Sequence, residues 1–301
     1  MTWFKRIGLF VAVNALVIGT ISILLNVLGV KPYIMAYGLD YQSLMIFCLI
    51  WGMGGAFISL ALSRVMAKWM MGVQIVPANT PDPELRELVQ MVHQLSRAAR
   101  LPAMPQVGVY ESQEVNAFAT GPSKSRSLVA VSSGLLLRMK NEEIRGVIGH
   151  EVAHIANGDM VTMTLVQGVV NAFVMFLARA IAYALTMAKG QGGEERGTPL
   201  SYYAVQFALE IAFMILGSMV VAWFSRRREY RADSGGARLA GRDNMIQALE
   251  GLKRTFDNVD PSAQPALQAL KISSRSGGFM KFFSTHPPLE ERIRRLRGAR
   301  A

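Results

Sequence analysis

His150, Glu151 and His154 stand in the pattern H-E-x-x-H, the spacing by which one helix can hold a metal ion with two imidazoles. Side chains four residues apart lie on one helical face, about 6 Å apart along the axis. Glu151 is offset from the two histidines, so its carboxylate reaches a water bound to the ion rather than the ion itself. The pattern therefore predicts metal-assisted hydrolysis with Glu151 as general base. The alternative is two histidines that pack on a helix face without a metal.

A catalytic zinc ion needs a third protein ligand and an open fourth position. The extended metzincin pattern requires Gly at position 157 and His at position 160, where this chain has Asn157 and Met160, so that class is excluded. Glu229 is the candidate ligand. It follows the last of the apolar stretches that, as argued below, predict membrane spans, and it therefore lies at the same membrane surface as the H-E-x-x-H helix. Asp233, one helical turn later, can accept a hydrogen bond from the second ring nitrogen of a histidine. Since Arg226–Arg231 is rich in arginine, the alternative is a solvated, salt-bridging helix.

The composition indicates that part of the chain lies in a membrane. Of the 301 residues 51% are hydrophobic and only 18% are charged, and the mean hydropathy is +0.26. A soluble domain usually carries about 25% charged residues. The net charge of +11 suits nucleic acid or an anionic membrane surface, and the hydrophobicity favours the membrane. Cys48 is the single cysteine, so no intramolecular disulfide can form, which excludes a disulfide-stapled secreted domain.

Two uncharged stretches near the N-terminus, Ile7–Val30 and Tyr41–Ser63, predict a transmembrane hairpin. The first is too long to be the apolar part of a cleaved signal peptide, which has about 7–15 residues. Its N-terminal flank, Lys5-Arg6, and the loop residue Lys31 mark its ends.

Two later apolar stretches, Met160–Ala188 and Ser201–Ser225, each contain one charged residue within the span, Arg179 and Glu210. If the stretches form a hairpin, the two charges lie at matched depth and can neutralise each other. We therefore expect an ion pair that joins these helices. The alternative is a buried or interfacial helical pair that belongs to the soluble part of the chain.

The distribution of positive charge predicts the orientation. With four spans, 28 of the 32 Lys and Arg residues lie on the side that holds the N-terminus and the two long polar segments. By the positive-inside rule both termini and the active site face the cytoplasm. We expect an α+β membrane protein, mostly helical with a small β-sheet, in four parts: a transmembrane hairpin (1–66), a cytoplasmic part with the sheet and the H-E-x-x-H helix (67–159), a second transmembrane hairpin (160–225) and a second cytoplasmic part (226–301).

Local patterns place the H-E-x-x-H on a helix that follows a strand. Three extended segments are separated by turns rich in Gly, Pro and Ser: Gln106–Tyr110, Val115–Thr120 and Ser127–Ser132. A helix then begins near Asn141 and runs to about Asn157, and Gly158 is a natural residue to end it.

With these motifs the chain resembles the HtpX family of bacterial membrane zinc endopeptidases, relatives of the CAAX prenyl endopeptidases. The resemblance covers essentially the full length and rests on the apolar spans and four motifs: Asn116-Ala117-Phe118-Ala119-Thr120-Gly121, the H-E-x-x-H, the E-x-x-x-D block at Glu229 and Asp233, and Thr285-His286-Pro287. It implies a gluzincin-like catalytic domain in the bacterial inner membrane. The implied role is proteolytic quality control of membrane proteins under heat or envelope stress, with membrane proteins or unfolded polypeptides as substrates.

The resemblance also implies roles for individual residues. His150, His154 and Glu229 are the ligands of one Zn²⁺ ion, Glu151 is the catalytic base, and Asp233 is the outer partner of His150. Substrate pairs with an edge strand near Asn116, Ala117 and Phe118, for which the alternative is an ordinary hairpin strand. His286 is a candidate oxyanion donor, and its alternative is a histidine that shapes the turn at Pro287-Pro288.

Two other functions compete with proteolysis. A membrane-anchored nucleic-acid binder could use the basic C-terminal part, but no aromatic residues are interleaved with Arg292–Arg300, so we expect no nucleic-acid partner. A zinc-dependent scaffold without catalysis would need the same ligands. A zinc protease and a zinc-dependent scaffold differ in whether their function depends on Glu151, because only the protease needs a general base.

Overall fold

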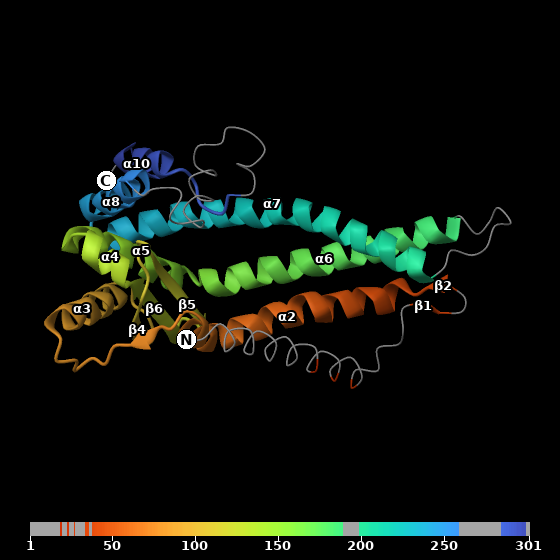
Figure 1. Cartoon of the computed structure of the whole chain (residues 1–301), viewed down its shortest axis with the longest axis horizontal. Coiled ribbons are helices and arrows are strands. Elements are labelled where there is room, and N and C mark those ends of the chain that lie inside the picture. Colours follow the sequence, from red (N-terminus) through yellow and green to blue (C-terminus); the bar gives the residue numbers. More distant parts are fainter. Residues whose placement is uncertain are drawn as a thin grey trace. The chain divides into compact units, whose positions relative to one another are not determined.

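The computed structural model describes residues 38–188, 199–258 and 284–298, together with isolated positions nearer the N-terminus (Figure 1). The predicted first span, Ile7–Val30, lies outside these three ranges. The contacts divide the chain into two compact units. Unit 1 contains Leu60–Thr162 and Ala222–Ala301, and unit 2 contains Trp3–Ser59 and Met163–Val221.

Three helices among the described residues are long and apolar enough to cross a membrane: α2 (Tyr41–Met70), α6 (Asp159–Ala188) and α7 (Pro199–Ala240). They confirm that the second, third and fourth predicted spans are helical. A short antiparallel pair, β1 (Ile34–Met35) and β2 (Gly38–Leu39), precedes α2. The α+β membrane architecture expected from the sequence is therefore correct.

Unit 2 contains the predicted charge pair. Arg179 Nη1 lies 2.6 Å from Glu210 Oε1, and the Gln206 amide donates to the same oxygen at 3.2 Å. Ionisable groups within a bilayer persist when they neutralise one another. The pairing of Arg179 with Glu210 is confirmed, and it links α6 to α7.

Helix α7 joins two parts that the sequence analysis treated separately, the apolar stretch Ser201–Ser225 and the helical segment that carries Glu229 and Asp233. It continues without a break to Ala240 and stops at Gly241, which has a φ of 99°. The arginine-rich continuation contains no proline, and Arg, Glu and Ala favour the helix. The continuity matters because Glu229 and Asp233 lie on this extension, within unit 1.

Unit 1 is built on a four-stranded sheet in the order β3-β4-β6-β5. The strands are β3 (Gln74–Ile75), β4 (Gln106–Tyr110), β5 (Ala117–Ser123) and β6 (Arg126–Ser132). Strands β4 and β6 are parallel, while β3–β4 and β5–β6 are antiparallel. The three extended segments expected from the sequence are therefore strands of one sheet, with ends that differ by at most three residues.

Beside the extension of α7, the described residues of unit 1 also form the helices α3 (Pro83–Ala98), α4 (Ser133–Arg138), α5 (Asn141–Asn157), α8 (Arg242–Asn258) and α10 (Leu289–Gly298). Asp82 caps α3 by accepting from the backbone N–H groups of Glu84 and Leu85. The core joins α3, α5 and the sheet through the following buried side chains: Val92, Leu95, Val129, Val131, Leu135, Ile148, Val152 and Ile155. This packing fixes the helix that carries the H-E-x-x-H.

Candidate metal centre

Helix α5 presents both histidines from one rigid element. It runs over Asn141–Asn157 and ends at Gly158, which adopts the left-handed conformation with a φ of 71°, as the sequence predicted. Ile148, Val152 and Ile155 are fully buried in the core, so the helix cannot rotate about its axis without exposing them. His150 and His154 are themselves only 8% exposed.

The α7 extension reaches α5 at a pair of glycines. A Cβ atom on Gly235 would lie 2.7 Å from Ala153 Cβ, and one on Gly236 would lie 2.9 Å from the His150 backbone nitrogen. Small residues therefore let the two helices approach closely at this point. The close approach brings Glu229, two turns earlier on α7, to the histidine side chains.

We expect Gly236→Ala to weaken metal binding and to destabilise unit 1 by about 1–3 kcal/mol, because the added methyl group must push α7 from the α5 backbone. Metal content and the thermal unfolding midpoint in detergent measure the two effects. Gly298→Ala is the matched control, since nothing lies within 4 Å of a Cβ at that exposed position. Equal metal content in the two variants would show that the glycine contact does not position Glu229.

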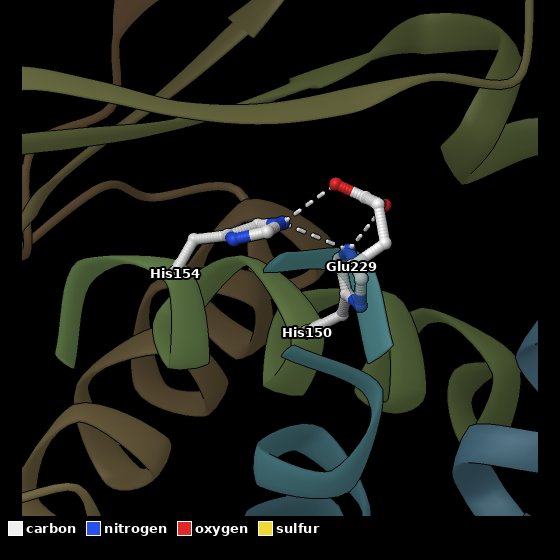
Figure 2. A group of neighbouring side chains, drawn as sticks. All are labelled: His150, His154 and Glu229. Carbon is white, nitrogen blue, oxygen red and sulfur yellow. Dashed lines mark hydrogen bonds and ion pairs between the residues drawn. The ribbon is translucent and has the colours of Figure 1, made fainter. Parts of the chain in front are cut away.

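The structure brings His150, His154 and Glu229 together (Figure 2). One donor atom from each residue lies within 4.8 Å of the other two, and all three residues are buried. The Glu229 carboxylate faces both rings: Oε2 is 3.4 Å from His150 Nε2, and Oε1 is 3.4 Å from His154 Nε2. The two Nε2 atoms are 3.0 Å apart. Two imidazole nitrogens and one carboxylate converge on one point, as in a three-ligand zinc site.

Each imidazole has a carboxylate at its second nitrogen. Asp233 Oδ1 lies 3.0 Å from His150 Nδ1, the contact that the resemblance implied. Asp159 Oδ2 lies 2.7 Å from His154 Nδ1, a contact that the sequence reasoning missed. An acidic residue directly after the glycine that ends α5 was the available signal for it. Carboxylates in this position orient metal-binding histidines and set their tautomers.

Arg292 also belongs to this group, and the sequence offered no signal for it. Its guanidinium binds Asp233 through two hydrogen bonds, from Nε at 2.8 Å and from Nη2 at 2.6 Å. Nη1 lies 3.9 Å from Glu229 Oε2. The side chain is 7% exposed, although it comes from the C-terminal helix α10. The arginine therefore compensates the charge of Asp233 in a place that water barely reaches.

His286 lies beside Glu229, where its Nδ1 is 2.9 Å from Oε2. Its side chain is half exposed. Arg228 Nη2 lies 3.3 Å from the other oxygen of Glu229. His286 is thus next to the cluster, in contact with the carboxylate that faces the two imidazoles, while its role as an oxyanion donor stays a prediction.

The charges of the buried groups fit a divalent cation. Glu229, Asp233 and Asp159 supply three negative charges, and among the buried groups that contact them Arg292 supplies one positive charge. With neutral imidazoles these four buried side chains carry two net negative charges, part of which the partly buried Arg228 beside Glu229 offsets. A divalent ion held by two nitrogens and one oxygen balances them.

Protons on the imidazoles are the alternative source of positive charge. Burial opposes the charged form of His154, but Asp159 and Glu229 outweigh burial and raise the pKa of its imidazole to about 9. Burial likewise opposes the charged form of His150, yet Asp233 and Glu229 raise its pKa. A metal ion that binds to these nitrogens must displace any proton on them.

Glu151 and β5 border the cluster. Glu151 is half buried on α5. Burial lowers the pKa of His154, whereas Asp159, Glu229 and the charge of Glu151 raise it. Ala117 and Phe118 begin β5, which packs against α5, and Asn116 immediately precedes them. Strand β5 pairs with β6 on one side and is the last strand in the described sheet. Its second edge is therefore free of any strand among the described residues.

Comparisons with known proteins agree on the family. The model of peptidase family M48 matches residues 82–300. A protease HtpX homolog of Bacillus subtilis (strain 168) is 50% identical over 299 residues, covering 97% of this chain and 98% of the relative. One from Methylacidiphilum infernorum (isolate V4) is 46% identical over 296 residues, with coverage of 97% and 98%.

The fold is similar to that of a solved protein with a longer chain. The crystal structure of S. mikatae Ste24p aligns with a TM-score of 0.62 at 18% identity. The alignment covers 97% of this chain, which spans only 64% of the Ste24p chain, so the similarity concerns the fold. Because the family model matches most of the chain and relatives match nearly all of it, the chain belongs to peptidase family M48, as a membrane metalloprotease of the HtpX family.

Proposed function

We propose that this metalloprotease is a zinc-dependent endopeptidase that cleaves misfolded or damaged membrane proteins at the cytoplasmic side of the bacterial inner membrane. The observation that carries the proposal is the buried group of His150, His154 and Glu229, with Glu151 on the same helix. Two nitrogens and one oxygen are the donor set of many catalytic zinc sites, which leave a fourth position for water.

Each residue of the group has a defined task in the proposed mechanism. His150, His154 and Glu229 hold the ion, which when bound lowers the pKa of a water molecule and polarises the scissile carbonyl. Glu151 takes the proton of the attacking water on its carboxylate and returns it to the leaving amine. Asp233 accepts from His150 Nδ1 and leaves Nε2 free to bind the ion. His286 is placed beside Glu229 and is a candidate donor to the developing oxyanion.

The open edge of β5 is the proposed substrate platform. An extended polypeptide that pairs with Asn116, Ala117 and Phe118 would be held mainly by backbone hydrogen bonds. Such binding depends little on the substrate's side chains, which suits an enzyme that removes many different damaged proteins. An unfolded segment fits this edge more readily than a folded one, because pairing requires a free, extended backbone.

The proposed orientation follows from charge. Most Lys and Arg residues fall in the segments 67–159 and 226–301, which we propose form one cytoplasmic catalytic part, while 1–66 and 160–225 form the two transmembrane hairpins. The support for the catalytic part is that His150 and Glu229, from the two separate segments, meet in unit 1. Proteolytic quality control during heat or envelope stress is the corresponding cellular role.

Chelation tests the proposed function directly. Purified full-length protein in detergent should contain about one zinc ion per chain and should cleave casein or an unfolded membrane protein. A chelator should abolish cleavage, and added zinc should restore it, because the ion activates the water. Metal analysis and gel-based cleavage assays measure the outcome. Cleavage that persists in metal-free protein would contradict the proposal.

A further inference from the structure

Asp159 lies where the H-E-x-x-H helix gives way to the next helix. Gly158 ends α5 in the left-handed conformation, and the chain turns so that Asp159, in the first turn of α6, returns to His154. Its carboxylate Oδ2 is 2.7 Å from His154 Nδ1, and the residue is only 2% exposed. Among the described residues, His154 is the side chain with which this carboxylate forms a hydrogen bond or ion pair.

The two carboxylates behind the histidines have different surroundings. Arg292 forms an ion pair with Asp233 and donates a hydrogen bond to each of its carboxylate oxygens. Asp159 contacts no cationic side chain other than the imidazole itself within the described part of the chain. The negative charge of Asp159 therefore acts mainly on His154, and burial leaves little water to screen that charge.

The chemistry of a carboxylate determines what this contact does. An ionised carboxylate only accepts hydrogen bonds, so the proton of a neutral His154 must sit on Nδ1. The lone pair of the ring then lies on Nε2, which is the atom that faces Glu229 at 3.4 Å and His150 Nε2 at 3.0 Å. A ring held in the opposite tautomer would present a proton, rather than a lone pair, to the ion.

We propose that Asp159 is a positioning residue that holds His154 in the metal-binding tautomer and orientation, in parallel with Asp233 at His150. This inference rests on the proposed zinc site. His154 and Asp159 are only five positions apart in the chain, so the short turn at Gly158 is enough to bring them into contact. Asp159 also lies in the first turn of α6, where the helix dipole stabilises a negative charge.

The decisive variant is Asp159→Asn, which conserves size but adds an N–H donor. The amide can donate to Nδ1 and so allows the wrong tautomer. We expect its zinc affinity, measured by chelator competition on the purified full-length protein, to fall about 10–100-fold. Asp159→Glu keeps an acceptor-only group and should retain more affinity than Asp159→Asn. Asp243→Asn, at an exposed position in the first turn of α8, is the matched control and should bind zinc like the wild type.

Cobalt substitution separates positioning from folding. The visible absorption of bound Co²⁺ reports ligand geometry, so it should change in Asp159→Asn and stay unchanged in Asp243→Asn, while the metal-free proteins unfold at similar temperatures. Wild-type zinc affinity and an unchanged cobalt spectrum in Asp159→Asn would overturn the role of Asp159 but leave the proposed function intact. Absence of zinc from the wild type would overturn the proposed function itself, and the role of Asp159 with it. If Asp159→Asn fails to fold, the zinc affinities of Asp159→Glu and Asp159→Ala are compared instead. Equal zinc affinities would show that a carboxylate at position 159 does not position His154.

Discussion

Glu151→Gln is expected to reduce peptide cleavage by about 10²–10⁴-fold while zinc stays bound. Glutamine has nearly the same shape as glutamate, but it cannot accept a proton from the attacking water. The zinc content should be unchanged because Glu151 lies outside the group of converging donor atoms formed by His150, His154 and Glu229. Cleavage of an unfolded substrate and metal analysis of the same preparation measure the two quantities.

The matched control is Glu142→Gln, which makes the same chemical change at an exposed position in the first turn of the same helix. We expect it to cleave at nearly the wild-type rate. Cleavage by Glu151→Gln at the wild-type rate would show that another group accepts the proton. Loss of zinc from Glu151→Gln would show instead that this carboxylate helps to hold the ion. The variant also distinguishes the protease from a zinc-dependent scaffold, whose function would not require a base.

Glu229→Ala is expected to remove both zinc and activity. The substitution deletes the single oxygen donor of the group and leaves Arg292 without one of its two acidic neighbours. It also removes the negative charge that faces both imidazoles, so that Asp159 and the Arg292-bound Asp233 remain as the buried carboxylates beside the histidines. Metal analysis should find far less than one zinc ion per chain.

Glu290→Ala serves as the control for this loss, because Glu290 is an exposed partner of Lys253 in a surface ion pair. Exposed pairs contribute about 0–1 kcal/mol, so this variant should keep its zinc and its activity. Wild-type zinc content in Glu229→Ala would mean that the carboxylate is no ligand. Glu151 is thus expected to affect the chemical step, whereas Glu229 is expected to affect the binding of the ion.

Local sequence patterns were sufficient for a large part of the fold. The helix over Asn141–Asn157, its end at Gly158 and the buried strand around Leu128–Val131 each follow from residues close together in the chain. The pair of Arg179 and Glu210 could also be predicted, although the residues are 31 positions apart. A membrane hairpin leaves few depths and few partners for a charge, so the constraint on that pair is strong.

The extent of α7 was less predictable. Its apolar pattern stops near Ser225, and a pattern of hydrophobicity cannot distinguish the end of a membrane span from the end of a helix. The helix continues because its next residues favour helical structure and because Gly235 and Gly236 allow it to pack tightly against α5. That packing is a property of two helices together and leaves no periodic signal in either one.

The groups that could perform hydrolysis are recognisable from the amino-acid sequence, because the spacing of His150 and His154 on a helix is a local, periodic feature. The side chains that surround them depend on how distant elements pack. Arg292 reaches Asp233 across 59 positions of sequence, and Asp159 reaches His154 through a turn whose direction Gly158 sets. Helical periodicity specifies neighbours within about one turn, whereas the partners of a buried charge are chosen by the packing of whole elements. Arg292 and Asp159 therefore became recognisable as partners of the candidate metal centre only in the tertiary structure.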